Sequence, residues 1–397
     1  MAPPPPPIEY VPSDGTFIDH ELSVNLDSTE AFEGPEKLLE IWFYPSQSQI
    51  PKNNGEIVKS LRSIPFDQWS KLLDLVNCKI LSITSSDKLN AFLLSESSLF
   101  VYDHKLILKT CGTTTTLYCL NALFKLIKSE LNWDFIIDEF KTQPYKVFYS
   151  RRAFMFPFKQ QLIHQNWNNE VEYLDQFFIN GYQYLIGRIN NSQWHLYLTN
   201  NSDIQPNESF DSTFEILMTE LSPAKSSNFI TSRKPGFEID ENDDLGHFLG
   251  KSTLSNIGLN NLFPESSTKV LHDAFQFTPC GYSSNTIINQ DSYYTVHVTP
   301  EKDWSYSSFE TNVNPILFNT SYLKILQDVL KMFKPNKFQV ILINNEHDDY
   351  STIDLFKLNE LNGYKKLDKI IYDLGNYQLL YLSFEITEDG LINDLTI

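Results

Sequence analysis

Leu93-Leu94-Ser95-Glu96-Ser97-Ser98-Leu99-Phe100-Val101 places hydroxyl side chains directly after a peptide carbonyl, between two apolar runs with strand character. Lys109-Thr110-Cys111-Gly112-Thr113-Thr114 follows one predicted hairpin later and supplies a thiol. A serine hydroxyl behind its preceding carbonyl can attack it and turn the amide into an ester, provided that the fold strains the turn and a neighbour stabilises the oxyanion. Elimination from that ester leaves dehydroalanine, which hydrolyses to a pyruvoyl group, an electrophilic ketone.

Hydrophobic periodicity extends strand and helix character to both sides of this stretch. It predicts strands at 80–84, 91–94, 98–102 and 106–109, and amphipathic helices at 66–76 and 117–131. The order strand, strand, helix, strand recurs at 293–299, 306–311, 322–333 and 338–344, which indicates an internal duplication. Hairpins joined to helices in this way predict an α+β fold with antiparallel sheets and helices outside. The polar, acidic region 222–262 is expected to be a long excursion or mobile loop.

Length and composition limit the class of protein. A chain of 397 residues can bury a large core; residues 1–28, proline-rich and then polar, are expected to form a flexible arm before a single domain at 29–397. The net charge of -19 argues against a nucleic-acid partner, because a negative surface repels phosphate. No signal peptide and no stretch of membrane-spanning length is recognisable, so a cytoplasmic protein is expected.

The cysteines and histidines do not form ligand patterns. Cys78, Cys111, Cys119 and Cys280 are widely spaced, which suggests neither a zinc ribbon nor a disulfide framework. The eight histidines are scattered in the same way, so no metal is expected. Reduced thiols are the default for such a chain.

The segment Leu94-Ser95-Glu96-Ser97-Ser98 closely resembles the processing site of the eukaryotic S-adenosylmethionine decarboxylases, whose proenzymes self-cleave at a Glu-Ser bond. The resemblance implies a cut at Glu96–Ser97 into a beta chain, 1–96, and an alpha chain, 97–397, with Ser97 becoming a pyruvoyl cofactor. It implies no metal and no pyridoxal phosphate. It also implies the family's four-layer αββα sandwich with two central antiparallel sheets.

Further motifs of the resemblance imply the chemical roles of other residues. Ser283, which follows Cys-Gly-Tyr, would stabilise the oxyanion intermediate of processing, and His297, before a Thr-Pro-Glu turn, would remove the Cα proton that drives elimination. Cys111 would return a proton to the substrate carbon after decarboxylation, since a thiol can act as an acid near the working pH. Glu33 and Glu36 match two active-site carboxylates of the family.

The resemblance also implies what the protein binds. The α-amine of S-adenosylmethionine would form a Schiff base with the pyruvoyl group and release CO2, giving decarboxylated product for spermidine and spermine synthesis. The substrate residues implied are Phe32 and Phe277 around the adenine, Glu301 on the ribose, and Leu94 and Glu96 beside them. The residues implied for the activating diamine putrescine are Glu40, Asp211, Thr213, Glu215 and Glu310, with Lys109 relaying its effect toward Cys111. A monomer and a dimer both remain open.

Several alternatives stand beside this interpretation. The chain could be a catalytically dead regulatory paralogue of an active decarboxylase subunit, although it retains Ser97, Cys111, Ser283 and His297. A thiol hydrolase using Cys111 and His297 would need a third orienting residue and would leave the Glu-Ser-Ser segment unexplained. The acids could be neutralised by ordinary Lys and Arg partners, and the histidine and phenylalanines could be core residues.

Overall fold

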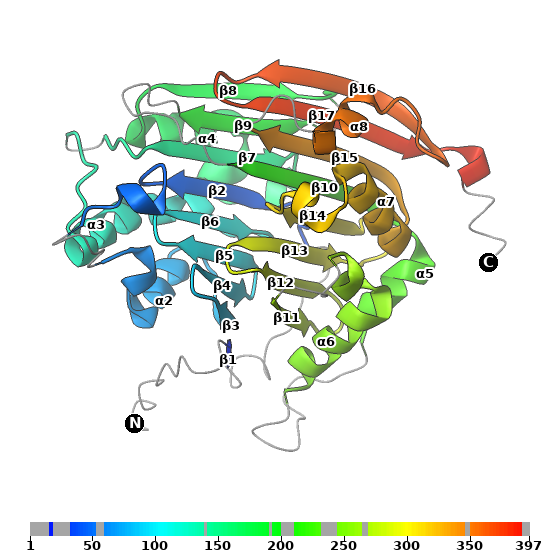
Figure 1. Ribbon diagram of the computed structural model, residues 1–397, viewed down its shortest axis with the longest axis horizontal. Helices are drawn as coiled ribbons and strands as arrows, with labels where there is room; N and C mark the ends of the chain where they lie inside the picture. Colours follow the sequence, from blue (N-terminus) through cyan, green and yellow to red (C-terminus); the bar gives the residue numbers. More distant parts are fainter. Residues whose placement is uncertain are drawn as a thin grey trace.

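Two antiparallel sheets stacked face to face, with helices on their outer faces, make up the protein (Figure 1). The computed structural model describes residues 16–18, 32–52, 59–138, 141–189, 193–199, 210–231, 244–263, 269–345 and 350–390. This arrangement confirms the predicted α+β sandwich with two central sheets and outer helices.

The first sheet has nine strands in the order β1-β3-β4-β5-β6-β2-β7-β9-β8 within the described residues. Its strands are β1 (Thr16–Ile18), β2 (Lys37–Trp42), β3 (Ile80–Ser85), β4 (Leu89–Leu94), β5 (Ser97–Tyr102), β6 (Lys105–Thr110), β7 (Lys146–Arg152), β8 (Gly181–Ile186) and β9 (Trp194–Thr199). Its helices are α2 (Phe66–Asp74), α3 (Leu120–Leu131) and α4 (Trp167–Phe177), with short 3-10 turns η1 (Gln47–Gln49), η2 (Leu61–Ser63), η3 (Thr116–Cys119), η4 (Pro157–Lys159) and η5 (Leu162–Gln165).

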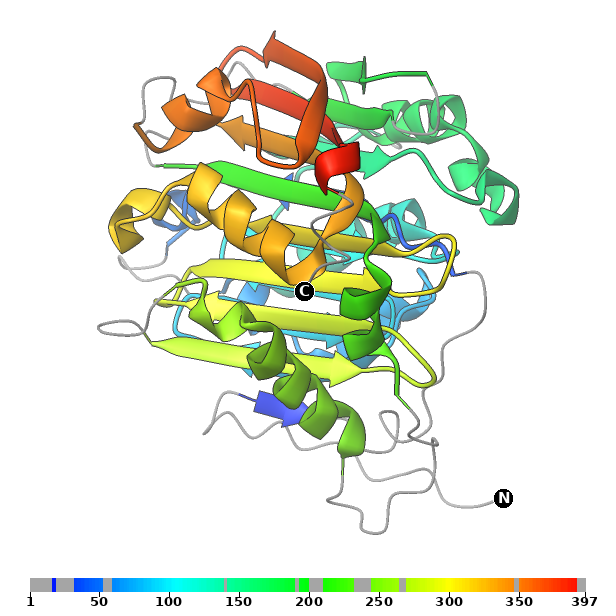
Figure 2. The same cartoon turned by 90° about the vertical axis from the view of Figure 1, so that its right-hand side faces the viewer.

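The second sheet has eight strands in the order β11-β12-β13-β14-β10-β15-β17-β16 over the same described ranges. Its strands are β10 (Ser212–Leu221), β11 (Val270–Gln276), β12 (Tyr282–Ile288), β13 (Ser292–Thr299), β14 (Tyr306–Thr311), β15 (Pro335–Asn344), β16 (Tyr364–Asp373) and β17 (Gln378–Ile386). Its helices are α5 (Pro223–Ser226), α6 (Leu245–Ile257), α7 (Tyr322–Phe333) and α8 (Tyr350–Lys357), with η6 (Ser227–Phe229), η7 (Leu259–Asn261) and η8 (Pro315–Phe318). Figure 2 shows α6 and α7 lying across the outer face of this sheet.

The two halves of the chain repeat one topology. Apart from β1, the two sheets have the same strand order: β3 corresponds to β11, β2 to β10 and β8 to β16, so that each pair of matching labels differs by eight. The helices follow the same rule, because α2, α3 and α4 occupy the same connections as α6, α7 and α8. The strand order therefore confirms the internal duplication that the sequence only indicated.

Strand alternation separates an outer core from the space between the sheets. In β2, Leu39 and Ile41 pack under the helices of the first half, whereas Leu38 joins a cluster with Ile287 and Tyr293 of the second sheet. Glu36 and Glu40 fall on the same inner face as Leu38, because side chains two positions apart lie on the same face of a strand. Charged side chains in the inter-sheet layer are buried, so each needs a partner there.

The prediction of a mobile loop at 222–262 is wrong for the part that the structure describes. That part contains α5 and the thirteen-residue helix α6, whose N-terminus is capped by Asp244 accepting from the His247 backbone N–H at 3.0 Å. Hydrophobic periodicity misses α6 because its buried face includes Gly246, His247, Gly250 and Thr253. Ala274 backbone lies where a Cβ on Gly250 would be, so glycine is required. The acidic residues Glu238, Asp240, Glu241 and Asp243 lie outside the described residues.

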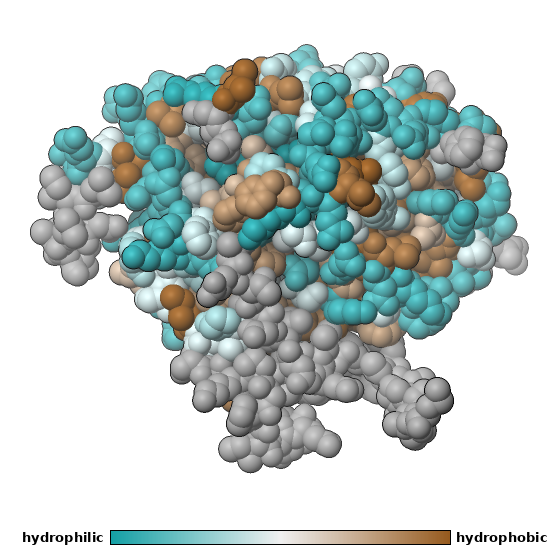
Figure 3. Space-filling model, turned by 180° about the vertical axis from the view of Figure 1, so that it is seen from behind, coloured by the Kyte–Doolittle hydropathy of each residue, from teal (hydrophilic) through white to brown (hydrophobic). Residues whose placement is uncertain are grey.

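The N-terminal segment and the surface complete the description. Within the arm expected at 1–28, residues 16–18 pair with β3 as an edge strand, and the remainder lies outside the described residues. The face shown in Figure 3 is largely hydrophilic, with separate hydrophobic patches. None of the described helices has the length and apolar character needed to cross a bilayer.

Candidate active site

A tight turn at Ser95 and Glu96 joins β4 to β5 and holds Ser97 in a strained conformation. Ser97 has a φ of 119°, a region that residues with a Cβ rarely adopt and that stores about 1–3 kcal/mol. Its side chain is 1% exposed, and its hydroxyl finds no hydrogen-bond partner among the described residues. A buried hydroxyl without a partner among the described residues thus lies directly behind the Glu96 carbonyl.

The Glu96 carbonyl oxygen accepts a hydrogen bond from the backbone N–H of Cys111 at 3.0 Å. The next peptide unit, between Cys111 and Gly112, is held at both its carbonyl and its N–H. Thr114 Oγ1 donates to the Cys111 carbonyl at 2.7 Å, and the next N–H, that of Gly112, donates to the Glu33 carbonyl at 2.8 Å. A fixed donor aimed at a carbonyl oxygen is the arrangement that stabilises an oxyanion.

Lys37 and Gln160 hold the carbonyl of the following residue, Gly112. Lys37 Nζ and Gln160 Nε2 each donate to the Gly112 carbonyl at 3.2 Å. Burial lowers the pKa of Lys37 to about 8, although the carboxylates of Glu170 and Glu33 oppose this shift. The Lys37 ammonium group brings positive charge close to Glu96 and Cys111. This charge opposes the rise in pKa that burial causes in both groups.

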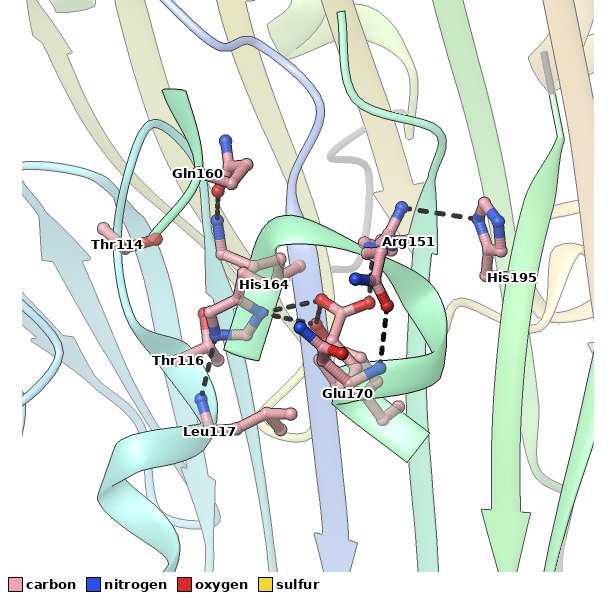
Figure 4. Close-up of polar contacts among 12 residues, drawn as sticks. Thr114, Thr116, Leu117, Arg151, Gln160, His164, Glu170 and His195 are labelled. Carbon is pink, nitrogen blue, oxygen red and sulfur yellow. Dashed lines mark hydrogen bonds and ion pairs between the residues drawn. The ribbon is translucent and has the colours of Figure 1, made fainter. Parts of the chain in front are cut away.

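A buried polar network beyond Lys37 anchors the loop that carries Gln160 (Figure 4). Glu170 accepts from Tyr149 Oη at 2.6 Å and from Arg151 Nε at 2.7 Å, and His164 Nδ1 lies 2.7 Å from the same carboxylate. Figure 4 also shows Arg151 reaching toward His195, which it meets at 3.4 Å. These side chains are buried and mutually satisfied, so the network is a rigid support for the site.

The thiol of Cys111 lies 3.8 Å from Glu96 Oε2. Burial raises the pKa of Glu96 to about 7. Burial, together with the carboxyls of Glu96 and Glu36, also raises the pKa of the Cys111 thiol well above its usual value. The sulfur atom therefore carries its proton at neutral pH, which suits a proton donor.

His297 on β13 lies between the two sheets and contacts three hydroxyl groups. Its Nδ1 is 3.0 Å from Ser283 Oγ, and its Nε2 is 2.8 Å from Thr295 Oγ1 and 3.2 Å from Ser98 Oγ. Burial and the charge of Lys109 lower the pKa of the ring well below its usual value. His297 is therefore a neutral base, and its serine neighbour on β5 is Ser98 rather than Ser97.

A cleft opens beside this group, and aromatic, polar and charged side chains line it. Of the residues predicted for the site, those that line it are Phe32, Glu96, Cys111, Phe277, Ser283, His297 and Glu301. Glu301 Oε2 accepts from the Phe32 backbone N–H at 3.1 Å, which ties the two walls of the cleft together.

Ser97 and three other predicted residues of the catalytic and substrate site, Glu33, Glu36 and Leu94, lie outside the cleft lining. Both carboxylate oxygens of Glu33 accept from the backbone, at 2.7 Å from Met155 N and 2.6 Å from Phe156 N. Glu36 accepts from Ser308 Oγ and from Tyr306 Oη at 2.8 Å, and only Tyr306 lines the cleft. Leu94 points into the outer core of the first half. Glu33 and Leu94 thus support the cleft from behind.

The residues predicted for a diamine form two clusters in the inter-sheet layer. In the first, Lys109 Nζ lies 3.0 Å from Glu215 Oε1 and 2.7 Å from Glu310 Oε2. Burial would lower the pKa of Lys109, but Glu310, Glu215 and Glu36 together raise it above its usual value, so it is charged. Burial and the neighbouring Glu310 raise the pKa of Glu215 to about 7.

The second cluster contains Glu40 and Asp211. Lys105 Nζ is 3.2 Å from Glu40 Oε1, and Lys146 Nζ is 3.0 Å from Asp211 Oδ2. The two ammonium groups stand over the Trp42 ring, 3.9 and 4.0 Å from its centroid. Thr213 lies on β10 between the two clusters, opposite Ile343 of β15. An open cleft lined by Trp42, Lys105 and Asp211 reaches this cluster from the surface.

Several residues of the site carry no recognisable motif. Asn285 and Thr295 stand two positions from Ser283 and His297 on β12 and β13, so the period of two along a strand was the available signal. In the sequence, Lys37 is one charged residue in a predicted strand, and Gln160 belongs to a short loop between η4 and η5, so neither shows a signal of its role. Only the fold brings these two to Gly112.

The fold and the site together define a duplicated two-sheet α+β protein with a strained serine turn and a small-molecule cleft at the sheet interface. A family model described as adenosylmethionine decarboxylase matches residues 29–385. The chain belongs to the adenosylmethionine decarboxylase family.

Individual relatives agree with that assignment. The S-adenosylmethionine decarboxylase proenzyme of Saccharomyces cerevisiae is 47% identical over 388 residues, which cover 93% of this chain and 96% of the yeast protein. The proenzyme of Xenopus laevis is 38% identical over 353 residues, which cover 89% of this chain and 95% of the frog protein. The crystal structure of a Trypanosoma brucei AdoMetDC-delta26 monomer matches with a TM-score of 0.52 at 20% identity, covering 73% of this chain and 99% of that one, and supports the fold.

Proposed function

We propose that this chain is the proenzyme of an S-adenosylmethionine decarboxylase, which cuts itself between Glu96 and Ser97 and then removes CO2 from S-adenosylmethionine for polyamine synthesis. The observation that carries the proposal is the strained, buried Ser97 hydroxyl behind a carbonyl that already accepts the Cys111 N–H. Membership of the family supports the activity. The products of the cut would be chains 1–96 and 97–397.

The first step is attack of Ser97 Oγ on the Glu96 carbonyl carbon. The C–N bond breaks, the amide nitrogen takes a proton, and the chain is then joined through an ester. Negative charge on the Glu96 oxygen develops 3.0 Å from the Cys111 N–H, which is fixed by its neighbours. Relief of the unfavourable φ at Ser97 contributes to the driving force.

The second step is elimination of the ester. His297, neutral because burial lowers the pKa of its ring, takes the Cα proton of residue 97, and the Glu96 carboxylate leaves. Hydrolysis of the resulting dehydroalanine releases ammonia and leaves the pyruvoyl group at residue 97. Ser283, 3.0 Å from His297 Nδ1, holds the ring in place on the cleft side.

The surroundings of residue 97 fit a pyruvoyl group, because the unpartnered Ser97 hydroxyl directly follows Glu96, which lines the cleft together with Cys111. When formed, the group supplies a carbonyl that condenses with the substrate amine and accepts the electron pair left by CO2. Cys111, a thiol with a raised pKa, then donates a proton to the substrate carbon. Phe32 and Phe277 offer aromatic faces to the adenine and the sulfonium cation, and Glu301 offers a carboxylate to the ribose hydroxyls.

We further propose that the two acidic clusters bind putrescine. The clusters contain four carboxyl groups, Glu40, Asp211, Glu215 and Glu310, and three ammonium groups, Lys105, Lys109 and Lys146; Glu36, whose charge also acts on Lys109, is a fifth carboxyl group beside them. Two of the five carboxyl groups therefore lack a cation of their own. Their two negative charges, when ionised, would match the two positive charges of one diamine. Burial raises the pKa of Glu36 and Glu215, so diamine binding would release protons from these acids. The thiol of Cys111 suits a reducing, cytosolic compartment.

Intact mass spectrometry of freshly purified protein, beside a Ser97→Ala control, tests the function. Wild-type protein should give chains 1–96 and 97–397, the second bearing a ketone that reacts with hydroxylamine, and should release CO2 from S-adenosylmethionine. The Ser97→Ala chain should stay whole. A single uncut wild-type chain, persisting with putrescine present, would instead support the regulatory paralogue.

A further inference from the structure

We infer that Asn285 and Thr295 fix His297 in the tautomer that carries its proton on Nε2, which leaves Nδ1 as the basic atom. Asn285, Thr295 and Ser98 form a buried hydrogen-bonded group on the side of the ring opposite Ser283. Asn285 and Thr295 are positioning residues, since they act through His297. The consequence for self-cleavage rests on the proposed function, whereas the tautomer itself does not.

The orientation of the Asn285 amide is the first step. Its Nδ2 lies 3.1 Å from the carbonyl oxygen of Phe92, a group that can only accept. The reverse orientation would place two oxygen atoms against each other in a buried site. Asn285 Oδ1 therefore points toward Ser98 and Thr295, at 2.7 and 3.0 Å.

The two hydroxyl protons follow from this orientation. Asn285 Oδ1 cannot donate, so the 2.7 Å contact requires Ser98 to donate to it. Thr295 Oγ1 lies 3.0 Å from Asn285 Oδ1 and 3.0 Å from the Ser284 carbonyl oxygen, both of which only accept. We assign the single Thr295 proton to one of them, since pointing it toward His297 would leave both contacts as oxygen pairs with no proton between them. Both hydroxyl oxygens consequently present lone pairs to His297.

The ring of His297 must then donate from Nε2. This atom lies 2.8 Å from Thr295 Oγ1 and 3.2 Å from Ser98 Oγ, so an unprotonated Nε2 would face lone pairs on both sides. A neutral imidazole has only one N–H, and Nδ1 is therefore the free base, which accepts the Ser283 hydroxyl at 3.0 Å. Any proton that His297 takes up during processing goes to Nδ1, directly or through Ser283.

Nitrogen-15 NMR of the Ser97→Ala precursor, labelled at its histidine rings, measures the tautomer without any cleavage. We expect the His297 ring to show a protonated Nε2 and an unprotonated Nδ1, assigned by comparison with a Ser97→Ala/His297→Gln chain. A protonated Nδ1 with an unprotonated Nε2, or an equal mixture of the two, would overturn the inference. Because the sample cannot cut itself, the result does not depend on whether the wild-type chain matures.

Two substitutions of Thr295 separate positioning from packing. Thr295→Val keeps the shape but removes the acceptor for Nε2–H, so the tautomer should shift and the ester should persist about 10-fold longer during self-cleavage. Thr295→Ser keeps the oxygen and should restore both the NMR pattern and the rate. Equal slowing by both variants, with the tautomer unchanged, would mean that Thr295 only fills space and would refute its positioning role.

Discussion

Lys109→Met should destabilise the folded chain strongly, and more so at high pH. The Lys109 ammonium group is the cation that contacts Glu215 and Glu310, at 3.0 and 2.7 Å, and it also lowers the pKa of Glu36. Removing one partner of a buried ion pair usually lowers the free energy of unfolding by about 3–5 kcal/mol, because charge is left buried without compensation. Methionine fills the space, so little of this loss comes from packing.

The sign of the pH dependence follows from the raised pKa of Glu215. A carboxyl group whose pKa is about 7 in the folded chain, against its usual value of 4.5, binds more protons in the folded state than in the unfolded state. Its contribution is favourable at low pH and is lost as pH rises through about 7. Without the opposing charge of Lys109, Glu36 should also keep its proton on folding, which adds about 1.4 kcal/mol per pH unit to the slope.

Chemical denaturation of the Ser97→Ala precursor at pH 5 and pH 8 provides the assay, since this chain stays homogeneous. Lys71→Met is the matched control: Lys71 pairs with Asp67 at 2.8 Å on α2 but is 67% exposed, so its loss should change stability by less than about 0.5 kcal/mol at either pH. Lys109→Arg should recover part of the loss at pH 8. If Lys109→Met and Lys71→Met behaved alike, or if the loss did not grow with pH, the charge argument would be wrong.

Three further changes test other parts of the site. Cys111→Ala should still cut itself but release CO2 about 100-fold more slowly in a radiometric assay, and an uncut chain would contradict its role as proton donor. Gly112→Ala should lower stability by about 1 kcal/mol, because the φ of Gly112 is 63°. It should also raise KM, because the added Cβ would lie 2.9 Å from Glu96 Oε2 in the cleft lining. An unchanged KM would show that the methyl group does not disturb the cleft. Glu170→Gln should lower thermal stability markedly, because the Arg151 Nε would lose the buried carboxylate oxygen that lies 2.7 Å away. An unaltered melting curve would show that Arg151 needs no counter-charge.

Much of the first half was predictable because its strands alternate or run apolar between clear turns. The hairpin β4–β5 and the helix α3 follow directly from such periodicity, and their predicted bounds lie within a few residues of the structure. Helix α6 was not predictable by this route. Its buried face is lined by glycine and polar side chains because it packs closely on β11, and hydrophobicity does not record that closeness.

The residues of the site also fall into two groups: those that a sequence motif reveals, and those that only tertiary packing brings together. Ser97, Cys111, Ser283 and His297 stand in motifs that the sequence displays, and the fold brings the last three to one cleft, together with Glu96, the neighbour of Ser97. The Lys37 and Gln160 contacts with Gly112 span 75 and 48 positions along the chain. No local pattern encodes such a contact, since it depends on how β2 and the η4–η5 loop are placed by tertiary packing.

The pairing of the strands explains how the protein could keep its fold after the proposed cut between Glu96 and Ser97. Strand β2, which belongs to residues 1–96, lies between β6 and β7, which both belong to residues 97–397, and it pairs with each along six residues. Strands β4 and β5 remain hydrogen-bonded on either side of the cut, and Ser95 is tied to Lys79 by two hydrogen bonds, at 2.8 and 3.0 Å. Separation of the two products would require the middle of the first sheet to open. Because β12 of the His297 hairpin also contacts β4, the ends of the proposed cut would stay close to His297 and Cys111.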